Sequence, residues 1–201
     1  MKILVSGASG FVGSSLCSHL VSRGFDVVAT VRNFPDASVP SVEYRIVTET
    51  SYTADWLDAL AAVDAVIHCA ARVHVMDDHT QDPLAEFRRV NTLGTETLAR
   101  AAAGSGVKRL IFLSSIKVNS ESALPDSPFN QTSPAKPQDP YAISKREAEQ
   151  ALTHIATETE LEVVIPLSAG LWSWGKGNFP AVATSSGSRY PTAIGFSKKP
   201  P

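Results

Sequence analysis

The sequence of 201 residues contains no apolar run near the roughly 18 to 20 residues that a membrane-spanning helix requires. Its opening aliphatic residues give way at Ser6 and Gly7 too soon for a secretory signal peptide. Only two cysteines occur, Cys17 and Cys69, and both lie in apolar surroundings outside any CxxC pattern. We therefore expect buried free thiols, no disulfide, and a cytoplasmic location.

Histidines at metal-ligand spacing are also missing. His74 and His79 flank Asp77 and Asp78, but nothing else in the chain completes a ligand set. This stretch is therefore expected to be a solvated loop, and no metal site is predicted.

Acidic residues are absent from the last 36 residues. All twenty Asp and Glu residues precede position 166, so the net charge of −2 combines −6 over residues 1–165 with +4 over the rest. At the acid density of the first part, about four acids would be expected in the second. The two parts therefore need separate explanations.

With 43% hydrophobic and 19% charged residues, the chain can form one sizeable globular core. Apolar strands alternate with helices, which predicts an α/β fold with a doubly wound parallel sheet, right-handed crossovers and helices on both faces. Strands are expected at 2–6, 26–32, 64–69, 109–114 and 161–165, and helices at 11–24, 54–62, from 83 for about 20 residues, and at 140–158. Residues 33–53 are expected to be mainly irregular, and residues 119–140 form a Ser/Pro-rich loop.

A glycine-rich turn separates the first strand from the first helix. Gly7 permits a tight turn, Gly10 allows a diphosphate to approach the backbone, and Gly13 lets the helix pack closely on the strand. The free N–H groups at the helix start, around Phe11 and Val12, face the anion. This context predicts a dinucleotide-binding site.

The end of the second strand selects the adenine ribose. An acidic residue there would accept hydrogen bonds from the 2′-hydroxyl of NAD, but this chain has Arg32. A guanidinium matches a 2′-phosphate, so Arg32 favours NADP over NAD. The alternative is a solvated arginine at a strand end.

Tyr141 and Lys145 stand four residues apart near the start of a predicted helix, hence on one face. A nearby cation favours the phenolate and brings the tyrosine pKa towards neutrality. Ser115, at the end of the fourth predicted strand, can offer a hydroxyl to the same substrate oxygen. A surface tyrosine beside a solvated lysine is the alternative, but the position after this strand favours catalysis.

With these parts in place, residues 1–165 resemble the extended short-chain dehydrogenase/reductase family, in particular its nucleotide-sugar epimerases, dehydratases and reductases. The resemblance implies a Rossmann-like fold, NAD or NADP as cofactor, and an enzyme of the epimerase/dehydratase type. The matching segments are Gly7 to Gly13, Asp64 to Ala71, Val90 to Thr95, Phe112 to Ser115 and Tyr141 to Lys145.

The resemblance also implies residue roles. Tyr141 becomes the acid/base, Lys145 its electrostatic partner and a ligand of the cofactor ribose, and Ser115 the hydroxyl that orients the substrate. Ala70 and Ala71 line the cofactor trough. The acidic residue that the family places near the adenine has no clear counterpart in residues 47–50.

Residues 72–76 and 114–119 look most like a branch that acts on UDP-N-acetylhexosamines. The resemblance therefore implies a UDP-hexose or UDP-N-acetylhexosamine 4-epimerase, with no nucleic-acid or membrane partner and with a homodimer as an open alternative. A UDP-4-keto-6-deoxy-sugar 4-reductase is the second interpretation. A non-catalytic dinucleotide-binding protein, or an inactive truncated chain, is the third.

The resemblance fails after residue 165. Where the family continues Arg-Pro-Pro-Leu-Val-Tyr-Gly-Pro-Gly, residues 166–174 differ, and only the following Lys-Gly-Asn-Phe agrees, which implies a substrate-binding role for Asn178. Codons can be chosen for Ala169 to Trp174 that, read one base later, give Leu-Val-Tyr-Gly-Pro-Gly. The same shift converts Ser185 to Tyr190 into a stretch typical of the family that includes an acid.

We therefore interpret residues 1–165 as an NAD(P)-binding domain and residues 166–201 as the remnant of a substrate-binding lobe, frameshifted in 166–174 and 180–201. A divergent Ser/Pro-rich tail is the alternative. If the tail is as written, residues 180–201 are expected to pack poorly.

Overall fold

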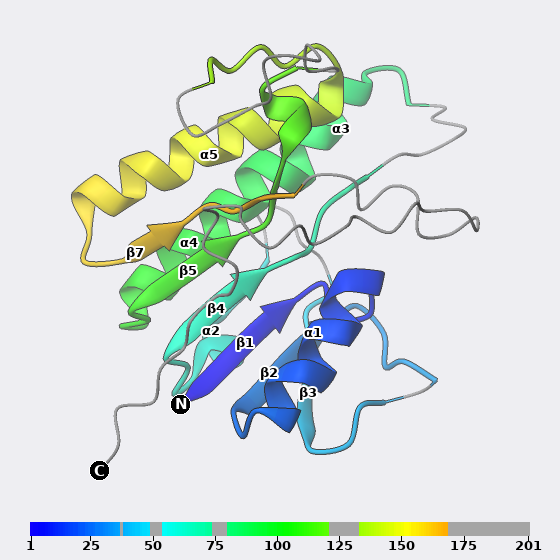
Figure 1. Cartoon of the computed structure of the whole chain (residues 1–201), viewed down its shortest axis with the longest axis vertical. Coiled ribbons are helices and arrows are strands. Elements are labelled where there is room, and N and C mark those ends of the chain that lie inside the picture. The colour runs from blue at the N-terminus through cyan, green and yellow to red at the C-terminus, as the bar shows by residue number, and fades with distance from the viewer. Residues whose placement is uncertain (37, 49–53, 74–79, 121–132, 169–201) are drawn as a thin grey trace, which may run out of the picture. The chain divides into compact units, whose positions relative to one another are not determined.

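Six parallel strands form one sheet in the order β3-β2-β1-β4-β5-β7 (Figure 1). The computed structural model describes residues 1–36, 38–48, 54–73, 80–120 and 133–168, all within a unit that spans Met1–Ala169. The strands are β1 (Lys2–Ser6), β2 (Asp26–Val31), β3 (Val42–Ile46), β4 (Ala65–His68), β5 (Arg109–Phe112) and β7 (Glu162–Val164). The order reverses between β1 and β4, where open α/β sheets bind ligands at the carboxyl ends of their strands.

The helices cover both faces of this sheet, as the alternating pattern predicts. In Figure 1, α1 lies on one face, and α4 and α5 pack together over the other. The helical elements are α1 (Phe11–Ser22), α2 (Leu57–Leu60), α3 (Pro83–Phe87), η1 (Arg88–Leu93), α4 (Gly94–Gly104), η2 (Ile116–Val118) and α5 (Pro140–Glu158). None of the helices in the described ranges is long and apolar enough to cross a bilayer.

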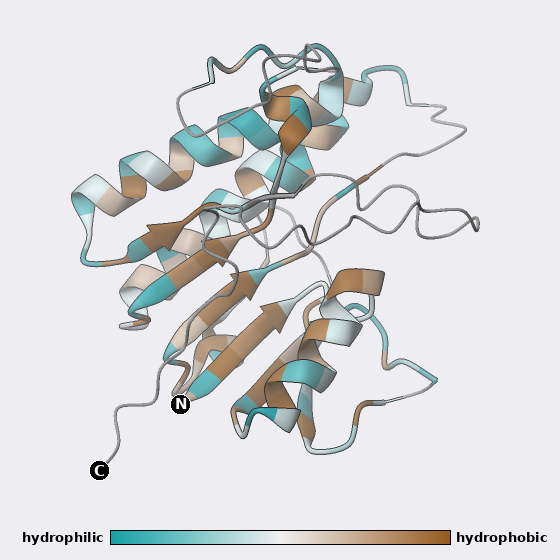
Figure 2. Cartoon of the chain, in the orientation of Figure 1, coloured by the Kyte–Doolittle hydropathy of each residue, from teal (hydrophilic) through white to brown (hydrophobic). Residues whose placement is uncertain are grey.

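The core is built where strand residues meet α4 and α5. Leu4 and Leu110 are fully buried and belong to the same apolar cluster as Leu98 of α4 and Leu152 of α5. Neighbouring residues of β1 are buried on the opposite face too, so its apolar run is continuous, and β1 appears brown over most of its length in Figure 2. The fold prediction is confirmed: the sheet is Rossmann-like.

The edge strand β3 corrects the expectation for residues 33–53. Its residues alternate between apolar and charged types and remain partly exposed, because an edge strand is paired on one side only. Glu43 forms ion pairs with Lys2 and Arg45. This alternation is the pattern of a half-buried strand, so the sequence carries a signal that the expectation of an irregular stretch overlooked.

The helical segments also differ from expectation. Residues 54–62 contain only the short α2, and the helix expected from Pro83 is divided by the π-helical η1 before it continues as α4. A π segment adds a residue to its turn and rotates the side chains that follow, so that Leu93 is 41% exposed whereas Thr95 and Leu98 are buried, and a regular apolar period cannot anticipate this change. By contrast, α5 has the expected bounds, and the Asp139 side chain caps it by accepting from Ala142 N–H at 2.6 Å.

A short second sheet pairs β6 (Ser114–Ser115) in parallel with β8 (Leu167–Ser168). Ser114 and Ser115 therefore lie beyond β5 rather than in it. Leu167 and Ser168 belong to the segment interpreted as frameshifted, and their pairing uses backbone groups that any sequence offers. The frameshift therefore stays a prediction, and residues 169–201 lie outside the described residues.

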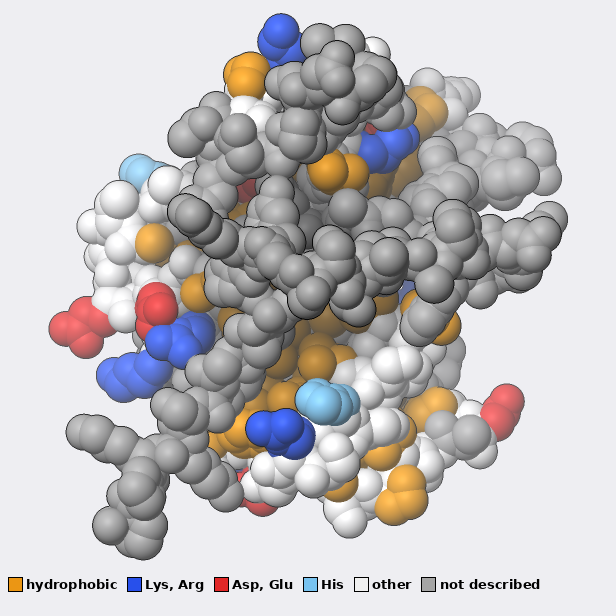
Figure 3. Space-filling model, viewed as in Figure 1, with side chains coloured by type: hydrophobic (Ala, Val, Ile, Leu, Met, Phe, Trp, Pro, Cys, Tyr) orange, Lys and Arg blue, Asp and Glu red, His pale blue; other side chains and the backbone are white. Residues whose placement is uncertain are grey.

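Charged side chains of both signs are dispersed over the described part of the face in Figure 3, and no extended patch of one sign covers it.

Candidate functional site

The turn after β1 needs glycine at two positions. Gly7 has φ +70°, and a Cβ there would lie 2.6 Å from the backbone nitrogen of Ala70. A Cβ on Gly13 would lie 2.2 Å from the Gly7 carbonyl oxygen, closer than two such atoms can approach. The first turn of helix α1 therefore packs closely against the glycine-rich loop that begins at Gly7, as the sequence predicts.

A pocket of about 550 Å³ opens beside this turn, at the carboxyl ends of β1, β2 and β4. Five of the ten residues expected to bind the cofactor line it, and the other five do not belong to its lining: Phe11, Val12, Gly13, Tyr141 and Lys145. Two arginines not foreseen in the sequence analysis, Arg72 and Arg89, line it too. The expected lining residues are Gly7, Gly10, Arg32, Ala70 and Ala71.

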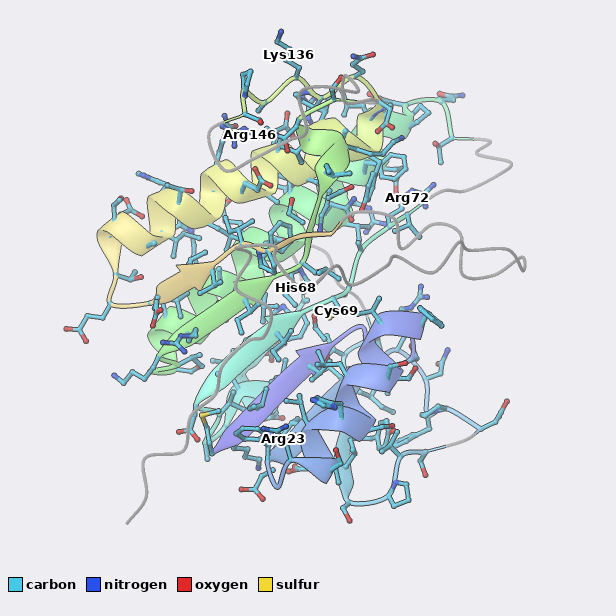
Figure 4. All side chains as sticks on the ribbon, viewed as in Figure 1. Arg23, His68, Cys69, Arg72, Lys136 and Arg146 are labelled. Atoms are coloured by element: carbon cyan, nitrogen blue, oxygen red, sulfur yellow. The ribbon has the colours of Figure 1, made fainter. Side chains whose placement is uncertain are left out.

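A buried hydrogen-bond chain supports the floor of the pocket. The Ala70 N–H donates to Ser6 Oγ, which lies 2.5 Å from His68 Nδ1, and His68 Nε2 lies 3.0 Å from Thr95 Oγ1. Burial and the charge of Lys145 lower the pKa of His68 to about 3, so the imidazole is neutral. Figure 4 shows His68 and Cys69 near the end of β4. Nothing in the sequence around His68 points to this position in the chain of hydrogen bonds.

Asn91, on the π-helical η1, ties one wall of the pocket to α5. Its side chain accepts from Arg72 N–H at 2.7 Å, donates to the Arg72 carbonyl at 3.0 Å, and donates to Ser144 Oγ at 3.0 Å. The side chain is 2% exposed. Asn91 therefore fixes the chain after β4 against the helix that carries the catalytic candidates.

The structure brings Ser115, Tyr141 and Lys145 together. Tyr141 hydrogen-bonds Ser115, and the Lys117 N–H donates to Ser115 Oγ at 3.3 Å. Lys145 Nζ donates to the Leu113 carbonyl at 2.7 Å. All three catalytic candidates thus meet at the end of β5.

The charges around Tyr141 differ from expectation. Burial raises the pKa of the phenol and the charge of Asp139 adds to this, while the hydrogen bond with Ser115 and the charge of Lys117 lower it, and the net direction is upward. Lys117 is the cation that lowers this pKa in the structure, and the electrostatic role expected for Lys145 towards Tyr141 stays a prediction. The Lys145 ammonium is 2% exposed and lies 3.8 Å from the Phe112 ring centroid, so its contacts are the carbonyl and the ring.

Burial also governs the remaining titratable groups of the site. It lowers the pKa of Lys145 to about 7, against the charge of Glu149, which raises it. Cys17 and Cys69 are free thiols, and burial raises both pKa values to about 11. Cys17 is buried as expected, whereas Cys69 is only partly buried.

Two expectations fall on residues that the structure does not describe. Asn178 and the stretch from His74 to His79 lie outside the described residues. Within the described ranges, no group of three or more His, Cys, Asp or Glu residues could hold a metal ion.

Comparisons with known proteins agree with this geometry. The model of the NAD dependent epimerase/dehydratase family matches residues 3–172. A UDP-glucose 4-epimerase of Vibrio cholerae is 38% identical over 182 residues, which cover 90% of this chain and 55% of that protein. A 2-alkyl-3-oxoalkanoate reductase of Stenotrophomonas maltophilia is 30% identical over 183 residues, covering 87% and 52%.

Solved structures give the same picture. MoeE5 in complex with UDP-glucose and NAD superimposes with a TM-score of 0.69 at 30% identity, covering 82% of this chain and 53% of that one. The chain thus spans about half the length of the relatives that it matches.

Proposed function

Because the chain belongs to the NAD dependent epimerase/dehydratase family, we propose that it is the cofactor-binding part of a nucleotide-sugar 4-epimerase acting on a UDP-hexose or a UDP-N-acetylhexosamine. The observation that carries the proposal is the meeting of Ser115, Tyr141 and Lys145 at the sheet edge that also forms the pocket. The similarity to a UDP-glucose 4-epimerase supports the choice of substrate.

The pocket suits a dinucleotide. Gly7 and Gly10 line it where a side chain would crowd the turn, and α1 begins directly after Gly10, so that the positive end of its dipole lies beside the turn. When bound, the nicotinamide of NAD or NADP supplies hydride chemistry at sugar C4. Arg32 is exposed at the pocket and favours a 2′-phosphate, hence NADP, whereas the solved relatives above contain NAD. Both cofactors belong in the assay.

The chain's own residues move and stabilise a proton. Tyr141 takes the proton from the 4-hydroxyl of the sugar and returns it. Ser115 is hydrogen-bonded to the phenol and is placed to orient the same oxygen. The Lys145 ammonium adds a positive charge beneath the site, which favours a substrate oxygen that is becoming negative.

A reduction is the second candidate. The similarity to a 2-alkyl-3-oxoalkanoate reductase shows that relatives of this chain include ketone reductases. The same serine, tyrosine and lysine would then protonate the oxygen of a UDP-4-keto-6-deoxy sugar and release the alcohol.

The proposal also covers the location of the protein and its division into domains. We place the protein in the cytoplasm, where Cys17 and Cys69 would remain free thiols. We assign residues 1–165 to the cofactor domain and residues 166–201 to the remnant of a substrate lobe.

The test compares wild-type protein with Tyr141→Phe. Binding of NAD(H) and NADP(H) is measured by fluorescence, and turnover is measured on UDP-glucose, UDP-N-acetylglucosamine and a UDP-4-keto-6-deoxy sugar. We expect the variant to keep cofactor binding and to lose at least about 100-fold in kcat, since general acid–base catalysis contributes on that scale. Tyr44→Phe, on the edge strand β3, is the control and should keep its turnover.

The outcomes separate the alternatives. Interconversion of epimers supports the 4-epimerase, and consumption of the keto sugar with reduced cofactor supports the reductase. Cofactor binding without turnover of any of these substrates by the wild-type chain would support the inactive, dinucleotide-binding interpretation.

A further inference from the structure

Helix α5 presents three polar residues at one-turn intervals to three consecutive residues beyond β5. Tyr141, Lys145 and Glu149 stand at positions i, i+4 and i+8, and therefore share one face of the helix. Each contacts a different member of residues 113–115. The contacts are Tyr141 with Ser115, Lys145 Nζ with the Leu113 carbonyl at 2.7 Å, and Glu149 Oε1 with Ser114 Oγ at 2.5 Å.

The third member of this row is a buried carboxylate. Glu149 is 6% exposed, and its two oxygens accept from Ser114 Oγ and, at 2.9 Å, from the Arg146 guanidinium. Figure 4 labels Arg146 on α5. Burying a carboxylate is costly unless it is hydrogen-bonded and opposed by positive charge, and both conditions are met here.

Lys145 lies one turn earlier, and its protonated form would be stabilised more by a nearby negative charge than by another hydrogen bond. Its ammonium is almost fully buried, and its contacts with the Leu113 carbonyl and the Phe112 ring are made with partial charges only. Of the described carboxylates, Glu149 is the one whose charge raises the pKa of Lys145.

The other titratable groups facing Lys145 do not supply that charge near neutral pH. Cys69 would raise the lysine pKa only as a thiolate, and its own pKa is about 11. His68, on β4, is neutral because its pKa is about 3. Arg146 faces Glu149 on the other side and partly offsets its charge.

We propose that Glu149 is a positioning residue that holds the buried Lys145 side chain in its protonated form beside Ser115 and Tyr141. It touches neither the cofactor pocket nor the substrate oxygen, and it acts only through Lys145. The consequence for turnover rests on the proposed function, whereas the protonation of Lys145 does not.

The decisive measurement is the titration of Lys145 itself, without cofactor or substrate. Protein labelled with 13C at lysine Cε is titrated by NMR, and the Lys145 signal is assigned by its loss in Lys145→Met. Glu149→Gln keeps the size of the side chain and one acceptor oxygen, and its NH2 group can donate to Ser114 Oγ, so we expect the fold to survive. The pKa of Lys145 should fall by about 1 or more, as expected for removing an opposite charge at this range.

Two further variants sharpen the test. Glu147→Gln removes an exposed carboxylate of the same helix, which pairs with Arg88, and should leave the Lys145 titration unchanged. Arg146→Met removes the cation that offsets Glu149, and should raise the pKa of Lys145. This opposite shift keeps the proposal testable even if Glu149→Gln does not fold.

An unchanged Lys145 titration in folded Glu149→Gln, or a fall in Arg146→Met, would overturn the proposal. If the full protein turns over a nucleotide sugar, kcat should decrease with rising pH, and this decrease should occur at a lower pH in Glu149→Gln than in wild type. Glu149→Asp should restore part of the wild-type pH profile. A titration shift without any turnover would uphold the role of Glu149 and count against the proposed function alone.

Discussion

Lys117 and Asp139 form an ion pair that joins η2 to the first turn of α5. The same Asp139 carboxylate caps α5 through Ala142 N–H, and Lys117 N–H donates to Ser115 Oγ. One pair of opposite charges therefore fixes the spacing between the serine and the tyrosine of the candidate site.

Replacing this lysine should make Tyr141 harder to ionise. The charge of Lys117 lowers the pKa of the phenol, so Lys117→Met should raise that pKa. The phenol of the variant should therefore lose its proton at a higher pH than that of wild type. NMR titration of protein labelled with 13C at tyrosine Cζ measures it. Lys136→Met, in the chain segment before α5, is the matched control and should leave the titration unchanged; equal titrations in Lys117→Met and wild type would contradict the assignment.

The glycine-rich turn should tolerate no side chain at Gly13. A Cβ there would lie 2.2 Å from the Gly7 carbonyl oxygen, so Gly13→Ala must displace α1 or the turn. We expect a loss of about 2 kcal/mol or more in the free energy of unfolding, as is usual for overpacking, measured by urea denaturation, together with weaker cofactor binding. Gly104→Ala is the control, since nothing lies within 4 Å of its added Cβ. Similar losses in both variants would show that crowding at the turn is not the cause.

Acid should destabilise the protein through His68. Its pKa is about 3 in the folded protein against 6.5 for an unperturbed histidine, so the unfolded chain binds a proton between these values that the folded chain does not. The contribution of His68 to the free energy of unfolding is therefore complete above pH 6.5 and is lost as the pH falls. By pH 5 the loss is about 2 kcal/mol.

His68→Gln removes this titration and keeps the capacity to hydrogen-bond Ser6 and Thr95. Urea denaturation at pH 7.5 and pH 5 should show a smaller loss for the variant than for wild type. The exposed His19→Gln should follow wild type. Parallel losses in all three proteins would mean that His68 is not the source.

The reading frame of the final residues can be tested directly. We propose that residues 166–174 and 180–201 arise from a one-base shift, because the acid-free composition and the interrupted resemblance begin at the same place. Resequencing of the gene should reveal the shifted base. An uninterrupted frame encoding the written residues, together with the matching intact mass of the natural protein, would end the proposal.

Much of the fold follows from local signals. The strand-turn-helix of residues 2–22 and the capped α5 combine apolar runs with glycine, proline and aspartate at defined positions, and each signal is contained in a few neighbouring residues. The edge strand β3 offers only the alternation of five residues, 42–46, within a Pro-containing stretch, and this short signal is easily overlooked.

The site divides in the same way. Tyr141 and Lys145 are visible as a spaced pair, but their electrostatics depend on tertiary packing and burial, which the spacing does not show. Lys117 reaches Tyr141 only after η2 folds against α5, and Glu149 gains its influence only through burial. His68 and Asn91 look like ordinary members of a strand and a helix until their partners, more than 15 residues away, are known.

Asn91 gives the two halves of the site a common anchor. It holds both backbone groups of Arg72, in the pocket wall, and the hydroxyl of Ser144, the residue before Lys145. Moving the wall without moving α5 would break buried hydrogen bonds of about 1 kcal/mol each. A displacement of the wall relative to α5 would therefore strain the hydrogen bonds that join Arg72 to the helix that bears Tyr141.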